Sequence, residues 1–190
     1  MTNDLLQRMA AAAPQVRAWI EALVAEHAPN SRPVADAGFM RLSSYFPATV
    51  LQNTRIVTVK KIPFLPFASF GLAEFSGVEK MAAAGITYRQ MCFLHEAMAS
   101  ESVCFHEIVH ALQWKVLGSR YLFTYGIGLM QNGYARSPLE VVAFDLQSAF
   151  DRGEPLTDLV ATVESRTLDA GRQVEAILRE HGIGLEAGGV

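Results

Sequence analysis

The 190-residue chain is expected to adopt a mostly helical α+β fold in which a small sheet packs beside one central helix. Three observations predict this fold. Apolar residues recur at helical spacing along several long segments, whereas only two segments have the β-branched and aromatic character of strands. The composition, with 51% hydrophobic and 18% charged residues, is sufficient for one buried core.

The first element is a helix over residues 4–27, in which Pro14 is expected to introduce a kink or a break. Residues 29–33 begin and end with proline and are interpreted as a linker. We therefore expect an N-terminal helical segment over residues 1–30, followed by the main domain over residues 31–181.

The strands are expected at residues 55–60 and 86–94, with a short helix between them at residues 79–84. Residues 62–75 are apolar and aromatic but are interrupted by prolines. We interpret this segment as a loop that is buried or covered by a partner. The alternative is an exposed surface that docks a protein or a membrane.

The later part of the chain is predicted to be helical. Residues 102–117 contain neither proline nor glycine, and two further helices are expected over residues 138–151 and 156–180. Residues 120–131 are aromatic and contain glycine, so they could form a helix or a loop. The glycine-rich residues 182–190 are expected to form a flexible tail.

The central helix carries the pattern His-Glu-x-x-His, at His106, Glu107 and His110. Side chains at positions i and i+4 of a helix share one face, so both imidazoles can bind one metal ion. Glu107 can then take a proton from a water that the metal activates. The alternative is a helix that carries two core histidines by accident, but buried imidazoles need polar partners.

A catalytic zinc site usually has three protein ligands, and Glu140 is the expected third ligand because it opens the helix that follows Ser137. The same spacing, Ser137-x-x-Glu140, is also a capping box, in which the glutamate would bond to the Ser137 backbone. The other possible ligands are Asp145, His95 and Glu96.

Two more candidate residues shortly precede Glu140 in the sequence. Tyr134 could donate a hydrogen bond to an oxyanion during catalysis, or it could be a half-buried structural aromatic residue. Arg136 could bind a substrate carboxylate, although an arginine at the start of a helix is usually solvated.

These residues resemble the small bacterial zinc-metallopeptidase-like domains of the gluzincin type. The resemblance is specific over about residues 100–147 and rests on two motifs: His106-Glu107-x-x-His110-x-x-Gln113 and Gly133-Tyr134-x-x-Ser137-Pro138-Leu139-Glu140. It implies a minimal zincin-like core with a Glu-bearing second helix. It also implies that His106, His110 and Glu140 bind zinc and that Glu107 is the general base.

The chain departs from the larger gluzincins at Phe144, where those enzymes often have an aspartate that orients a ligand histidine. Either another group of this chain orients the imidazoles, or their orientation is less strictly fixed, which would affect catalytic efficiency rather than metal binding.

The remaining features limit the classes of function. A net charge of −3 and a pI near 5.9 give no electrostatic case for nucleic-acid binding. No secretory signal and no apolar stretch long enough to span a membrane is evident, so a cytoplasmic protein with Cys92 and Cys104 as reduced core thiols is expected. No phosphate-binding loop, dinucleotide fingerprint or nucleophile elbow is present.

The sequence therefore predicts a zinc-dependent metallopeptidase-like hydrolase that acts on a peptide or protein. Its oligomeric state is left open. The alternative is a zinc-stabilised binding module without turnover, which docks a protein or a membrane surface through residues 62–75.

Overall fold

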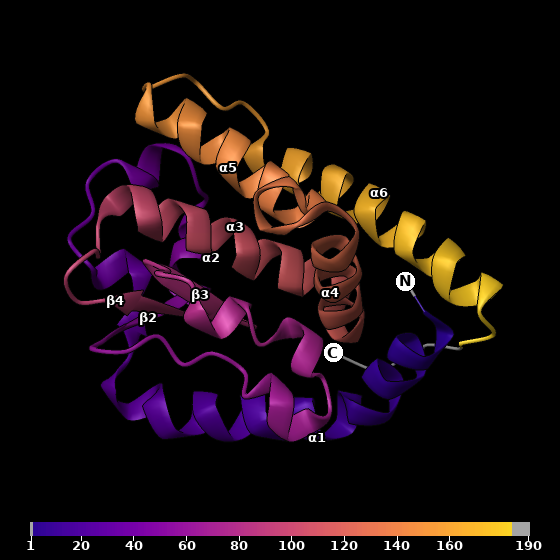
Figure 1. Ribbon diagram of the computed structural model, residues 1–190. Helices are drawn as coiled ribbons and strands as arrows, with labels where there is room; N and C mark the ends of the chain where they lie inside the picture. The colour runs from indigo at the N-terminus through magenta and orange to yellow at the C-terminus, as the bar shows by residue number, and fades with distance from the viewer. Residues whose placement is uncertain (1, 184–190) are drawn as a thin grey trace.

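The structure is a computed structural model that describes residues 2–183, and it confirms a mostly helical α+β fold with a small mixed sheet (Figure 1). Short 3₁₀ turns lie in the connections. The helices are α1 (Asn3–His27), α2 (Ala48–Asn53), α3 (Glu101–Leu117), α4 (Tyr121–Asn132), α5 (Pro138–Asp151) and α6 (Leu159–Glu180). The strands are β1 (Arg32–Pro33), β2 (Arg55–Val59), β3 (Gly85–Tyr88) and β4 (Met91–His95).

The sheet has the strand order β1-β2-β4-β3, in which β2 and β4 are parallel and the outer pairs are antiparallel. Alternate residues of β4 pack on opposite layers. Met91 and Phe93 join the cluster that includes α1, whereas Cys92 and Leu94 join the cluster that includes α3. Because both faces of β4 are covered, its sequence is almost continuously apolar.

The prediction of one strand over residues 86–94 is wrong, because these residues form the hairpin of β3 and β4. Tyr88 pairs with Met91, so the turn consists of Arg89 and Gln90, and Arg89 has a positive φ of 56°. Neither residue is the glycine or asparagine that usually marks such a turn. The short helix expected over residues 79–84 is also corrected, because the structure has only a 3₁₀ turn at Val78–Lys80 there.

Helix α3 lies between the sheet and the layer formed by α5 and α6 (Figure 1). Ser100 caps its N-terminus by accepting a hydrogen bond from the Val103 backbone N–H. Gly118, with a positive φ of 54°, ends it as expected. Most of the helix is buried, including both histidines and Glu107 of the motif. The motif is therefore presented to other parts of the protein rather than to bulk solvent.

Helix α1 runs along the other side of the sheet and is continuous through Pro14, which does not end it. The segment 62–75 packs beside α1 (Figure 1), and its Leu65 and Phe75 are buried in the same cluster. Arg8 of α1 holds this segment by bonding to the Gly71 carbonyl and the Glu74 carboxylate. The interpretation of 62–75 as a buried loop fits this packing.

The other predictions are met in part. Residues 120–131, which could have been a helix or a loop, form α4, and the helix expected from residue 156 begins at Leu159. Residues 29–33 contain a 3₁₀ turn and β1, so they are more ordered than a linker. Residues 184–190 of the expected tail lie outside the described part of the chain.

Candidate metal centre

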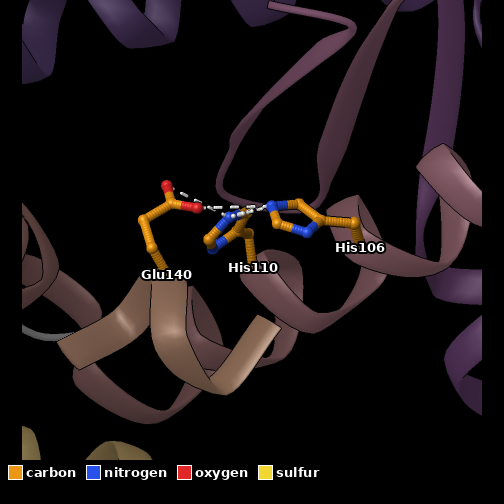
Figure 2. Close-up of side chains that lie close together, drawn as sticks. All are labelled: His106, His110 and Glu140. Atoms are coloured by element: carbon orange, nitrogen blue, oxygen red, sulfur yellow. Dashed lines mark hydrogen bonds and ion pairs between the residues drawn. The ribbon is translucent and has the colours of Figure 1, made fainter. Parts of the chain in front are cut away.

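The two histidines of the motif and Glu140 converge in the structure (Figure 2). The Nε2 atoms of His106 and His110 are 3.0 Å apart. The Glu140 carboxylate reaches them from the first turn of α5: its Oε2 is 3.4 Å from Nε2 of His106 and its Oε1 is 3.5 Å from Nε2 of His110. All three residues are buried, with relative exposures of 2% to 6%.

This geometry fits a metal ion. The two contacts to Glu140 are longer than ordinary hydrogen bonds, which end near ~3.2 Å. Ligand atoms ~2.0–2.1 Å from a tetrahedral zinc ion lie ~3.3 Å from each other, which is close to the three separations observed here. Within the described residues, Oε2 of Glu140 is buried without a hydrogen-bond partner. The three residues therefore form a buried group that could hold a metal ion.

Two glutamines orient the imidazoles. Gln113 donates from Nε2 to the Leu139 carbonyl at 2.9 Å, so its Oε1, 2.8 Å from Nδ1 of His110, accepts from that ring N–H. Gln147 donates to Ser102, and its Oε1 is 3.0 Å from Nδ1 of His106. With Nδ1 donating to a glutamine in both rings, the lone pair of each neutral ring lies on Nε2, and the two Nε2 atoms face each other.

These contacts account for Phe144, which stands where larger gluzincins often have an aspartate. Its ring packs 4.8 Å from the ring of His106, and it lines the site without offering an acceptor. The supporting acceptor comes instead from Gln147, three residues later on α5. The sequence offered Gln113 as a residue that could hydrogen-bond across the helix pair, which it does at the Leu139 carbonyl. Gln147 was missed, because its contact with His106 depends on how α3 and α5 pack.

The capping-box interpretation of Glu140 is not what the structure shows. Ser137 precedes α5 at the N-cap position, but its side chain makes no capping bond there. The Glu140 carboxylate accepts a 2.7 Å hydrogen bond from the Tyr125 hydroxyl instead and faces the histidines. The competing ligands lie elsewhere: Asp145 pairs with Arg166 on the surface, and neither His95 nor Glu96 belongs to the group.

Glu107 lies beside this group and is held by β3. Its Oε2 accepts a 2.7 Å hydrogen bond from the Thr87 hydroxyl. Gly85 makes room for the carboxylate, because a Cβ on that residue would lie 2.6 Å from Oε1 of Glu107. Burial raises the pKa of Glu107 above the ordinary carboxyl value, although His110, His106 and Thr87 act in the opposite direction.

The charges within the group oppose the effect of burial. Burial alone would lower the pKa of His110, but the Glu140 carboxylate outweighs it and raises that pKa to about 9. Burial would likewise raise the pKa of Glu140, but His110 and His106 hold it well below its usual range. The site thus stabilises positive charge between the imidazoles and the carboxylate, whether a proton or a metal ion carries it.

Two tyrosines lie near Glu140. Tyr134, which the sequence singled out, is half-buried, and its ring is 6.0 Å from that of Phe144. Tyr125 on α4 makes the direct hydrogen bond to Glu140 and was missed, because the sequence left residues 120–131 undecided between helix and loop. Burial, together with the Glu140 charge, raises the pKa of both phenols, so both are hydrogen-bond donors at neutral pH.

A cavity of about 370 Å³ adjoins the group, and His106, His110, Glu140 and Glu107 all line it. Its other walls come from α1, the segment between residues 64 and 84, β3 and α4. Arg136, the possible carboxylate ligand, is exposed and does not line the cavity. Cys92 and Cys104 are free, buried thiols, and neither belongs to the group of possible metal ligands found among the described residues.

Comparison of the chain with protein-family models, with curated proteins and with solved structures gave no significant match. The resemblance of residues 100–147 to gluzincin-type domains therefore rests on the motif residues and on the buried group that they form. Among the described helices, none is both long enough and apolar enough to cross a membrane.

Proposed function

We propose that the protein is a zinc-dependent hydrolase of the metallopeptidase type, with His106, His110 and Glu140 as the zinc ligands. The observation that carries this proposal is the position of Glu107, a buried carboxylate that shares one cavity with the three-residue group. A structural metal site has no need of a fourth ionisable side chain of this kind. Structural zinc sites are also usually closed by four protein ligands, whereas catalytic sites keep one position for water.

Zinc bound in such a site lowers the pKa of water and polarises a carbonyl oxygen. The chain's own residues supply the proton transfers. A Glu107 carboxylate oxygen accepts the proton of the attacking water and later donates it to the leaving amine. Thr87 keeps that carboxylate in place during both steps through its 2.7 Å hydrogen bond. The protonated phenol of Tyr134 is the proposed donor to the developing oxyanion.

The edge of the sheet supports the same proposal. The strand order makes β3 an edge strand, whereas β4 lies inside the sheet between β2 and β3. An extended peptide could therefore add beside β3, next to Gly85 and Glu107. The carbonyl of Thr87 is already bonded to the Trp114 indole at 3.0 Å, which leaves the Gly85 end of the strand as the place for such pairing.

The test is Glu107→Gln, measured for both zinc content and hydrolysis of a mixture of fluorescence-quenched peptides. The variant is expected to bind zinc like the wild type but to lose hydrolysis by at least about a hundredfold. Glu96→Gln, at an exposed glutamate shortly before α3, is the matched control and is expected to retain activity. Retained hydrolysis in a clean Glu107→Gln preparation would contradict the mechanism.

The non-catalytic alternative receives less support, because the large apolar side chains Leu65, Leu72 and Phe75 of its docking segment are buried. Chelation separates the two functions. A site that only stabilises the fold should lower the melting temperature strongly when zinc is removed. A catalytic site beside a self-sufficient core should lose hydrolysis and little thermal stability.

A further inference from the structure

The cavity beside the metal group is too large to be an ordinary packing defect. Protein interiors are packed as densely as organic crystals, with few voids larger than a water molecule. A cavity of about 370 Å³ is instead within the range of ligand-binding pockets. Because it is continuous with His106, His110 and Glu107, a group bound in it would lie directly against the proposed reaction centre.

The walls away from the metal group are apolar. Helix α1 contributes Met9, Ala13 and Val16, which are spaced so that they share one face of the helix. The segment 64–84 adds aromatic side chains and three consecutive alanines at residues 82–84, whose small side chains leave the space unfilled. Aromatic rings of α4 close the third side.

The charges that line the cavity restrict what it can bind. No lysine or arginine is among the described residues of its walls, and the only carboxylates are Glu107 and Glu140. Against the walls away from His106 and His110, a substrate carboxylate or phosphate would therefore be buried without a cation, which is strongly unfavourable. An uncharged apolar group is the occupant that these walls favour.

We infer that this cavity binds a bulky apolar side chain of the substrate next to the bond that is cleaved, and that the Ala13 face of α1 limits its size. This inference rests on the proposed function, which it deepens by naming the substrate class. It excludes recognition of a free C-terminal carboxylate in the cavity, so the chain would cleave within a peptide rather than release its last residue.

The test uses the full-length protein and the uncharged fluorescent probe N-phenyl-1-naphthylamine, with and without zinc. The probe should bind the wild type with one site per chain. It should be displaced by the blocked dipeptide acetyl-Phe-Leu-amide and not by acetyl-Glu-Asp-amide. Ala13→Phe, which puts a large ring into the cavity, should weaken probe binding by at least about tenfold. Ala18→Phe, on the exposed face of the same helix, should leave it unchanged.

A second filling variant, Ala83→Phe, lies in a different segment of the cavity wall and keeps the test valid if Ala13→Phe does not fold. The inference is overturned if the wild type does not bind the probe, if the acidic dipeptide competes as well as the apolar one, or if folded filling variants bind normally. The proposed function fails separately. Suppose that the wild type binds the probe, that both filling variants abolish this binding, and that the zinc-loaded wild type cleaves no peptide. The proposed hydrolase function would then be refuted, and the cavity would remain an apolar binding site.

Discussion

Gln113 should control zinc affinity although it does not touch the metal. The side chain is fully buried, accepts from Nδ1 of His110 at 2.8 Å and donates to the Leu139 carbonyl at 2.9 Å. In Gln113→Leu, which is similar in size, both bonds are lost without leaving a large cavity. A lost neutral hydrogen bond costs about 1 kcal/mol and an unsatisfied buried donor about 1–3 kcal/mol, so we expect a loss of about 2–4 kcal/mol in the free energy of unfolding.

The same substitution frees the His110 ring to turn and to exchange its tautomer. Loss of such a supporting contact typically weakens metal binding by about 10- to 100-fold. The dissociation constant for zinc would be measured by competition with a chromogenic chelator, and the stability of the zinc-free protein by urea unfolding. Far-ultraviolet circular dichroism would first establish that the variant is folded under the conditions of the titration.

Gln90→Leu is the matched control, because Gln90 also bonds to α3, donating to the Ala111 carbonyl at 3.0 Å, but contacts neither histidine. It should lose about 1 kcal/mol of stability and no zinc affinity. The reasoning is refuted if folded Gln113→Leu binds zinc within about twofold of the wild type, because Gln113 would then support only the packing of α3 against α5.

Three further predictions follow from contacts of β3 and α1. Gly85→Ala places a Cβ 2.6 Å from Oε1 of Glu107, so hydrolysis should fall by at least about tenfold with zinc content unchanged. Thr87→Val removes the hydrogen bond that favours the charged form of Glu107, so the acid limb of the pH–rate profile should move to higher pH. Arg8 lowers the pKa of Glu74 to about 2, so the stabilisation from this pair is present above the unfolded carboxyl pKa and is lost as the pH falls. The melting temperature of Glu74→Gln should therefore be below that of the wild type at pH 7 and should approach it near pH 2.

Each of these predictions has an outcome that would contradict it. Full hydrolytic activity in Gly85→Ala would mean that the Glu107 carboxylate does not need its present position against β3 for catalysis. An unshifted acid limb in Thr87→Val, with Thr87→Ser as the control that keeps a hydroxyl, would show that Thr87 does not affect the titration. If the melting temperatures of the wild type and Glu74→Gln differ as much at pH 2 as at pH 7, the ion pair between Arg8 and Glu74 is not the cause of that difference.

The grouping of His106, His110 and Glu140 as possible metal ligands was predictable from the sequence because much of it depends on local geometry. The spacing of His106 and His110 places them on one face of any helix, and Glu140 follows a proline that suits the start of a helix. The alternatives at Glu140 could not be separated from the sequence. A capping glutamate and a ligand glutamate occupy the same helical position, and only the packing of α5 on α3 turns the carboxylate toward the histidines.

The surroundings of the group could not be predicted because they depend on contacts between distant segments. Gln147 reaches His106 across 41 positions of the chain, and Gly85 is small because of a carboxylate 22 positions later. The hairpin between β3 and β4 was missed for a different reason. Its turn at Arg89 uses a left-handed conformation without glycine or asparagine, so the local sequence carries no turn signal there.

Elemental analysis of the purified protein for zinc, made on the wild type and on Glu140→Ala, tests the central claim most directly. Three converging ligands predict about one zinc ion per wild-type chain. Glu140→Ala is expected to bind zinc more weakly and to contain much less than one zinc ion per chain. Leu139→Met, at the neighbouring buried position of α5, is the control for an indirect effect of disturbing that helix. A wild type that holds no zinc even after zinc is added back would contradict the account, and the convergence of His106, His110 and Glu140 would then be explained by a shared proton alone.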